Sequence, residues 1–256
     1  MNLRSSFSQR IRLEWLEFTA QAVLQGETRE AIQAQLQTLL KEQLSAAGSS
    51  PRGNREKATT IRLRTWVAGP RWLEPFRNDG LAFLQSMPAA DHLAVHWGMV
   101  MAVYPFFGSV AETVGRLIRL QNNFTAAQIL RRLREQYGER ETVQWAAQRV
   151  LRCFVDWGVL RDSDEKGVYQ AASGYAIRSE KLVLWLIEAV LLSTRVNSMP
   201  LADAVRFPSL FPFTLEAINP RALLQMSRLQ TFRQALDEEV VPLTQSGHLI
   251  RKIGSP

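Results

Sequence analysis

The sequence predicts a mainly α-helical protein with one short β-hairpin. Apolar residues recur at helical spacing through much of the chain, and glycine or proline interrupts these segments. Residues 159–170 add two short strand-like runs around a polar turn. With 256 residues, of which 46% are hydrophobic and 21% charged, the chain has an ordinary globular composition and the length of two or three small domains.

The N-terminal region, residues 1–87, is predicted to form a helical, helix-turn-helix-like domain. Gly26 interrupts a first helical pattern, and Thr28 has the chemistry of an N-cap for the next helix. A linker-like stretch at 45–53 precedes a basic helix at 54–67. The basic side chains of that helix that could contact DNA are Arg55, Lys57, Arg62 and Arg64. A plain solvent-exposed helix face would carry the same charges, so both interpretations stay open.

Residues 93–111 contain no Asp, Glu, Lys or Arg. As one helix they would extend about 28 Å, which approaches the thickness of a bilayer core. A central helix that is buried on all sides would have the same composition. His96, Pro105 and the charged residues after position 111 favour the buried helix. We expect Asp91 to be its N-cap, Pro105 to end or kink it, and a second helix to follow over 109–120.

Residues 122–172 carry the most informative pattern. Thr125 can cap a helix that Gly138 ends, and a second helix is predicted from about 141 to 157. Two short strands then enclose a polar turn. This order of helix, turn, helix and hairpin predicts a winged-helix domain, which with its leading apolar helices covers residues 88–175.

In the DNA-binding use of this fold, the second helix enters the major groove. Arginine and glutamine can read base edges, and arginines on the first helix can hold phosphates. The predicted DNA contacts in this domain are Arg131, Arg132, Thr142, Gln144, Gln148, Arg149, Arg152 and Lys166. Trp145 is either a core or an interface residue. Because the hairpin is acidic, a protein–protein adaptor without DNA contact is the alternative function.

Two motifs suggest a relationship to a known family. The apolar helix runs into a Tyr-Pro-Phe-Phe block at 104–107, and an Arg-Val-Leu-Arg run at 149–152 lies in the predicted second helix. Over residues 94–169 the chain resembles the BrxA family of BREX bacteriophage-exclusion systems, and residues 24–32 with the basic helix resemble that family's opening. The resemblance implies a helical DNA-binding component of a phage-defence system.

The C-terminal region, residues 176–256, is predicted to be helical. An apolar helix covers 177–194 and carries Glu188. Residues 195–220 contain four prolines among large apolar side chains, and they predict an extended connection that packs on the protein. Helical spacing returns over 221–239.

The sequence offers no catalytic or metal-binding motif. His92 and His96 have the i, i+4 spacing that zinc ligands use, but neither an HExxH sequence nor an obvious third ligand accompanies them. Cys153 is the single cysteine, so an intramolecular disulfide is impossible, and we expect it to be buried. P-loop, Gly-x-Gly-x-x-Gly and Gly-x-Ser-x-Gly motifs are absent. We therefore expect a protein that is not an enzyme and has no cofactor or metal.

Charge favours a polyanionic partner. The chain carries 31 basic and 24 acidic residues, a formal net charge of +7. The predicted function is non-catalytic binding of double-stranded DNA through the winged helix and the basic N-terminal helix, with other defence-system proteins as candidate partners. Because the N-terminus lacks the apolar core of a secretory signal, we expect a cytoplasmic location without membrane attachment.

Overall fold

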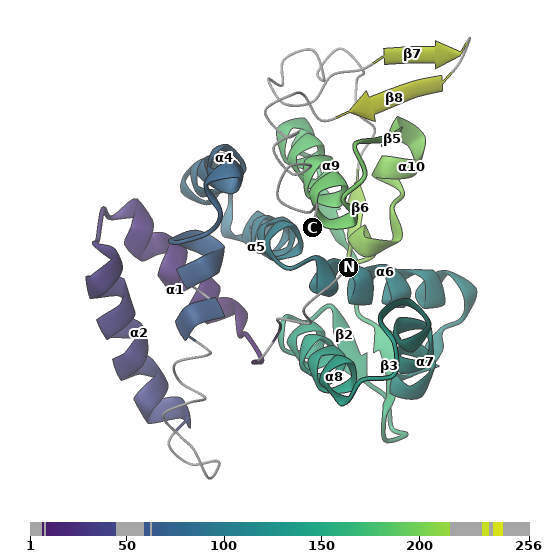
Figure 1. The fold of residues 1–256 in the computed structure, drawn as a ribbon, viewed down its shortest axis with the longest axis horizontal. Helices are drawn as coiled ribbons and strands as arrows, with labels where there is room; N and C mark the ends of the chain where they lie inside the picture. The colour runs from purple at the N-terminus through teal and green to yellow at the C-terminus, as the bar shows by residue number, and fades with distance from the viewer. Residues whose placement is uncertain are drawn as a thin grey trace, which may run out of the picture.

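The computed structural model of the protein describes residue 7 and residues 9–44, 59–61, 63–215, 232–235 and 238–242. This part of the chain is mainly helical, as predicted (Figure 1). Its helices are α1 (Leu13–Leu24), α2 (Arg29–Leu44), η1 (Arg71–Leu73), α4 (Glu74–Ser86), α5 (Ala89–Val103), α6 (Pro105–Leu120), α7 (Ala126–Tyr137), α8 (Glu141–Asp156), α9 (Glu180–Thr194), α10 (Leu201–Val205) and η2 (Pro208–Leu210). Residues 59–61 and 63–66 are also helical. The predicted linker at 45–53 and the predicted DNA contacts Arg55, Lys57 and Arg62 lie outside the described residues.

The strands of the described residues are short and form three small sheets. They are β1 (Asn123–Thr125), β2 (Leu160–Asp162), β3 (Val168–Ala171), β4 (Tyr175–Ile177), β5 (Ser198–Pro200), β6 (Phe213–Leu215), β7 (Phe232–Ala235) and β8 (Glu238–Pro242). The first sheet has the order β1-β3-β2 and is antiparallel. β4 and β6 pair in parallel, and β5, β8 and β7 form an antiparallel sheet.

The helices α5, α6 and α9 lie at the centre of the molecule (Figure 1). α5 and α9 approach each other closely, because Gly98 has no side chain: a Cβ there would stand 2.4 Å from the indole ring of Trp185. That indole is fully buried, stacks on the ring of Phe76 with 4.2 Å between centroids, and donates a hydrogen bond to the Phe76 carbonyl oxygen. These contacts join α4, α5 and α9 into one packed unit.

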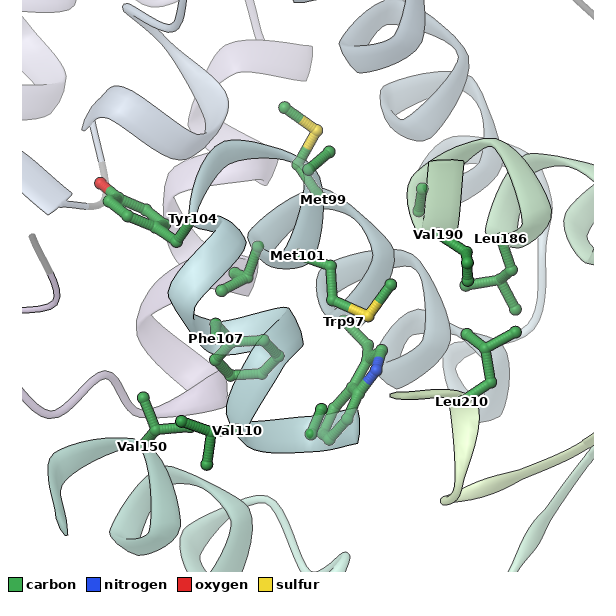
Figure 2. Packing of buried hydrophobic residues seen from close by; sticks show 14 of the residues in the cluster. Trp97, Met99, Met101, Tyr104, Phe107, Val110, Val150, Leu186, Val190 and Leu210 are labelled. Atoms are coloured by element: carbon green, nitrogen blue, oxygen red, sulfur yellow. The ribbon is translucent and has the colours of Figure 1, made fainter. Parts of the chain in front are cut away.

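Trp97 of α5 is the aromatic centre of the core. It has no exposed surface, and its ring lies within 6.0 Å of the rings of Phe107, Phe154 and Trp157. Its indole nitrogen donates to the carbonyl oxygen of Ser209 over 3.0 Å. Figure 2 shows how side chains from α5, α6, α8, α9 and η2 meet around it.

Most of the buried hydrophobic residues of the described chain form one cluster, and a second, small cluster lies between α1, α2 and Leu63. The larger cluster extends from Phe7, ahead of α1, to Val241 in β8. It crosses both predicted domain boundaries, at 87/88 and at 175/176, so the three regions share one core. The division into three domains stays a prediction.

The charge-free stretch forms two helices that meet at a sharp bend. α5 ends at Val103 and α6 begins at Pro105, which confirms the break predicted at this proline. Within the described ranges, no single helix is long and apolar enough to cross a bilayer, and α5 with α6 meets that test only as a pair bent by 119°. Residues 93–104 are all buried by the protein itself. The interpretation as a helix buried on all sides is therefore confirmed for α5.

Several predictions differ from the structure. The described residues hold three small sheets where one hairpin was predicted, and the predicted extended connection over 195–220 contains α10 and η2. Pro88, not Asp91, is the N-cap of α5, and Asp91 lies in the first turn. α6 begins at Pro105 and not at 109, because the fixed φ of proline suits the first position of a helix. The helix predicted over 221–239 is wrong at β7 and β8, where pairing between strands overrides helical spacing. Residues 221–231, 236 and 237 of that prediction lie outside the described part.

The N-terminal helices begin and end where the sequence predicts. Gly26 adopts a φ of +77° in the turn after α1, a conformation that favours glycine. Thr28 then accepts a hydrogen bond at its hydroxyl from the Ala31 amide over 3.3 Å, as an N-cap does. Ile32 and Leu36 of α2 are fully buried against α1 and the helical residues after position 58.

Candidate nucleic-acid interface

Within residues 122–172, the first helix is α7, and reciprocal hydrogen bonds hold its N-terminal end. The hydroxyl of Thr125 accepts from the Gln128 amide over 3.2 Å, and the Gln128 side-chain oxygen accepts from the Thr125 amide over 2.8 Å. This capping box satisfies two amides that would otherwise lack a partner. Gly138, with a φ of +81°, ends the helix. Both predicted boundaries of α7 are confirmed.

The second helix, α8, divides into a buried and an open face. Its buried stripe is the predicted one, and it consists of Val143, Ala146, Ala147, Val150, Leu151 and Phe154. On the opposite side, residues spaced three or four apart form a stripe that we call the outer stripe of α8. It contains Thr142, Trp145, Arg149 and Arg152. Thr142, Trp145 and Arg152 are exposed, and Arg149 is partly buried. Trp145 is therefore a surface residue, which excludes its interpretation as a core residue.

A hydrogen bond between side chains ties α7 to α8. The guanidinium of Arg134 donates to the side-chain oxygen of Gln144 over 3.0 Å. Gln144 was predicted to contact DNA, and in this structure its oxygen is occupied while its amide group remains a donor. Gln148, one turn further, is partly buried. The hydrogen bond between Arg134 and Gln144 thus links the two helices.

An ion pair ties α8 to the hairpin. One guanidinium nitrogen of Arg152 donates to both carboxylate oxygens of Asp162 in β2, over 3.0 and 2.9 Å. The two side chains are 49% and 50% exposed. Such an exposed pair contributes little to stability because water screens it. The pair therefore orients Arg152 without binding it so firmly that a phosphate could not replace Asp162.

The hairpin between β2 and β3 ends in an exposed polar turn. Lys166, the predicted contact at its tip, is exposed, and so are Asp164 and Glu165. Gly167 completes the turn with a φ of +80°. Further down the hairpin, burial raises the pKa of Tyr169, an effect that the nearby Arg152 partly offsets. The tip presents one cation next to two anions.

The arginine side chains of α7 have different surroundings. Arg131 is exposed, whereas Arg132 is partly buried in an open groove of about 860 Å³ between α6 and α7. Arg116 and Arg119 line the same groove from α6. Glu112 forms an ion pair with Arg116, so part of the positive charge there is already neutralised.

Arg64 lies apart from the residues of α7 and α8. Its guanidinium is 5.7 Å from the centre of the Tyr104 ring, and burial raises the pKa of that tyrosine. Arg64 also lines a second groove, together with Arg29 of α2. Figure 1 shows α7 and α8 with their strands gathered below α6, whereas the helical residues 59–66 lie beside α1. The elements that carry the predicted contacts of residues 122–172 therefore lie together, and Arg64 lies apart from them.

Charge is distributed unevenly over this block. Residues 122–172 contain eight basic and seven acidic residues, so the whole block is close to neutral. α7 carries three arginines and one glutamate, and the β2–β3 hairpin has more acidic than basic residues. Contact with a polyanion is therefore favoured more on α7 than on the hairpin, where Lys166 is the one cation at the tip.

Two histidines and a glutamate form a separate buried cluster. The ring of His96 is fully buried and hydrogen-bonds through Nε2 to a carboxylate oxygen of Glu17 over 2.8 Å. His92 reaches the same carboxylate through Nδ1 over 3.1 Å, and Gln21 donates to it over 2.8 Å. The hydrogen bond from His96 lowers the pKa of Glu17 to about 2, and burial lowers the pKa of His96. The cluster thus fastens α5 to α1.

This cluster does not form a metal site. Among the described residues, no group of three or more His, Cys, Asp or Glu side chains is arranged to hold a metal ion. His96 turns one ring nitrogen to Glu17, and its other nitrogen is buried without a hydrogen-bond partner in this part of the chain. Cys153 is buried as predicted, and its sulfur accepts a hydrogen bond from the Ile11 amide over 3.1 Å.

The contacts that orient the candidate residues were not predicted from the sequence. β1, which pairs with β3 and joins the hairpin to the start of α7, was missed. So were Asp162 as the partner of Arg152 and Glu17 as the partner of the two histidines. An acidic residue in the first strand after an arginine-bearing helix was the available signal for the pair between Asp162 and Arg152.

In comparisons with known proteins, no protein-family model, no curated protein and no solved structure matches this chain. The resemblance to the BrxA family accordingly rests on the sequence motifs alone.

Proposed function

We propose that residues 105–172 form a winged helix that binds double-stranded DNA without catalysing a reaction. The order α6, β1, α7, α8 and the β2–β3 hairpin supports this fold, as does the antiparallel sheet β1-β3-β2. In a helix-turn-helix, the second helix enters the major groove. Here that helix is α8.

The observation that carries the proposal is the outer stripe of α8. It leaves Thr142, Trp145 and Arg152 open to solvent, while the opposite face of the same helix is buried in the core. A helix with one face fixed and the other exposed can enter a groove without rearrangement. Its arginines suit guanine edges or phosphates, and Gln148 suits adenine.

The neighbouring residues complete the proposed footprint. Arg131 and Arg132 on α7 would contact phosphates beside the groove, and Lys166 would contact the backbone from the hairpin. Arg64, with Arg55, Lys57 and Arg62, belongs in this proposal to a second contact surface at the N-terminal helices. From the sequence resemblance to the BrxA family, we further propose that the DNA binding serves a bacterial phage-defence system.

A titration of duplex DNA at two salt concentrations tests the proposal. The double variant Arg149→Ala, Arg152→Ala should weaken binding and reduce the salt dependence by about one unit of slope for each phosphate that is no longer bound. The matched control is Arg71→Ala with Lys181→Ala, which removes two exposed cations from η1 and α9. If both double variants bind equally well, α8 is not the recognition helix.

The alternative is a protein–protein adaptor without DNA contact. It is favoured by Leu120, which is 74% exposed at the end of α6, next to the groove lined by Arg116 and Arg119. A protein partner that covers Leu120 would remove its apolar surface from water, which favours association. Under this alternative the protein has no measurable affinity for duplex DNA at moderate salt, and Leu120→Ala releases a co-purified protein.

A further inference from the structure

Trp145 differs from every other tryptophan of the chain. The indole of Trp145 is 54% exposed. Five of the other six are between 0 and 4% exposed, and these are Trp15, Trp66, Trp97, Trp157 and Trp185. Trp72 is partly buried. A large aromatic ring in water is costly because its apolar surface gains nothing from the core. A ligand that covers the ring of Trp145 would remove this cost.

The surroundings of Trp145 are polar and partly cationic. On the outer stripe of α8, Thr142 precedes it by three residues and Arg149 follows it by four, so both side chains lie about 5–6 Å away, measured between Cβ atoms. Gln144 and Gln148 flank the stripe. Glu141, at the start of the helix, is the acidic neighbour. The stripe therefore offers one flat apolar ring within a polar rim that carries arginines.

Two acidic groups at the far end of the stripe are already paired. Asp156 forms an ion pair with Arg10, which lies in the segment before α1. Asp162 pairs with Arg152. Neither carboxylate stands unpaired against an approaching anion, and Arg149 lies one helical turn from the indole on the same stripe. Glu141, at the start of the helix, is the exposed acidic residue nearest the indole. The flat indole favours an aromatic partner, and Arg149 and Arg152 favour one that carries negative charge.

Nucleic acid with an exposed base has this chemistry. In a closed duplex both faces of each base are covered by its neighbours, so an indole can touch only base edges. At a gap or an unpaired strand end, bases lack a pairing partner and a base face can become free, so an aromatic side chain can stack on it. The adjacent phosphates would then lie within reach of Arg149 and Arg152.

We propose that Trp145 is a stacking platform for an unpaired base, and that the α8 surface therefore prefers duplex DNA carrying a gap or an unpaired end over fully paired duplex. This inference rests on the DNA binding proposed above and adds to it the structural feature that is recognised. A stacked base contributes enough to strengthen binding by about fivefold or more.

Fluorescence provides a direct test of contact, because Trp145 is the most exposed tryptophan. Acrylamide quenching should show an accessible fraction that Trp145→Phe removes. A duplex with a one-nucleotide gap should protect this fraction from acrylamide in the wild-type protein, and the fully paired duplex should protect it less. Equal protection by both duplexes would contradict the proposal.

Binding of three variants separates stacking from general hydrophobic contact. Trp145→Phe keeps an aromatic ring and should retain most of the preference for gapped DNA. Trp145→Leu keeps an apolar side chain but has no flat ring, so it should lower the ratio of affinities for gapped over fully paired DNA by about fivefold. Leu120→Ala, which removes the other strongly exposed apolar side chain, is the control and should leave the preference intact.

The outcomes distinguish this inference from the proposed function. If paired duplex binds in a salt-dependent way and Trp145→Leu does not change the ratio of affinities, DNA binding holds and the stacking role is wrong. If neither DNA binds, both proposals fail. If Trp145 is protected from acrylamide only as the protein concentration rises, the ring contacts a second copy of the chain and the stacking role is also wrong.

Discussion

The helices α5 and α8 have similar lengths, and each carries a tryptophan on its second or third turn, yet their surroundings are opposite. α5 is buried from Leu93 to Val103, with α4, α6 and α9 packed around it. α8 buries one stripe and leaves the other in solvent. Trp97 has no exposed surface, whereas Trp145 is 54% exposed.

The difference shows how the same residue type acquires two roles. On α5 the apolar residues surround the helix, so a tryptophan at any position meets other side chains. On α8 the buried apolar residues recur every three or four residues, and position 145 lies on the opposite, polar face. Helix packing thus makes Trp97 a stabilising residue and leaves Trp145 available for binding.

The largest expected effect on stability is that of Trp97→Ala, and Trp145→Ala is its matched comparison. Trp97→Ala should lower the free energy of unfolding by about 3–5 kcal/mol, because it empties a fully enclosed aromatic site and leaves the Ser209 carbonyl without its donor. Trp145→Ala should change it by less than about 0.5 kcal/mol. Chemical denaturation measures both. A comparable loss of stability in the two variants would show that Trp145 is a core residue after all.

A smaller effect is expected where α5 is fastened to α1. Glu17→Gln should lower the free energy of unfolding at neutral pH by about 1–3 kcal/mol, because a charged acceptor of hydrogen bonds from His96 and Gln21 is removed. Gln21→Ala, which removes only one of these donors, is the milder control.

Glu17 and His96 also make the stability of the fold depend on pH, so that it decreases as the pH falls. The pKa of Glu17 is lowered from 4.5 to about 2, so the stability due to its carboxylate is present above about pH 4.5 and is lost as the pH falls towards 2. The pKa of His96 is also lowered, from 6.5, so protonation in the unfolded chain destabilises the fold below that pH. The difference between wild type and Glu17→Gln should therefore shrink below pH 4.5. A constant difference down to pH 2 would argue against the carboxylate's role.

The sequence predicted most local features of the helices correctly, apart from the N-cap of α5, and the long-range contacts poorly. Thr125 as a cap, Pro105 as a break and the buried stripe of α8 all depend on residues within one or two helical turns. Glu17 lies 79 positions from His96, and no spacing rule connects them. The strand β7 fell within a helical pattern because its pairing with β8 is set by the fold and not by local periodicity.

In the candidate site too, local features could be predicted from the sequence and long-range contacts could not. The sequence predicted that Thr142 and Arg152 of α8 are exposed, as they are, but Gln144, Gln148 and Arg149, predicted to be exposed too, are partly buried. It did not predict that Asp162 would meet Arg152, because that contact depends on how the hairpin folds back on the helix. The orientation of the site was therefore not available from the sequence, although most of its residues were.

An intermediate effect is expected at the start of α7. Thr125→Ala removes the hydroxyl of the capping box and should cost about 1 kcal/mol of stability. Thr125→Ser keeps the hydroxyl and should recover most of that stability. Thermal unfolding of the two variants measures the difference. If alanine and serine are equally stable at this position, the cap does not hold α7 in place.

The smallest effect on stability, and the sharpest test of the open face of α8, is Asp162→Asn. Because the ion pair with Arg152 is exposed, its removal should change the free energy of unfolding by less than about 0.5 kcal/mol. Arg152 would then lack its carboxylate partner, and a negative charge would leave the proposed DNA surface. Affinity for duplex DNA should therefore rise a few-fold, most strongly at low salt, where charges act over longer distances. Asp203→Asn, on the short helix α10, removes an exposed carboxylate outside this surface and should leave the affinity unchanged. If Asp162→Asn weakens binding instead, the ion pair is needed to orient Arg152, and the hairpin then contributes to recognition through its acidic residue rather than in spite of it.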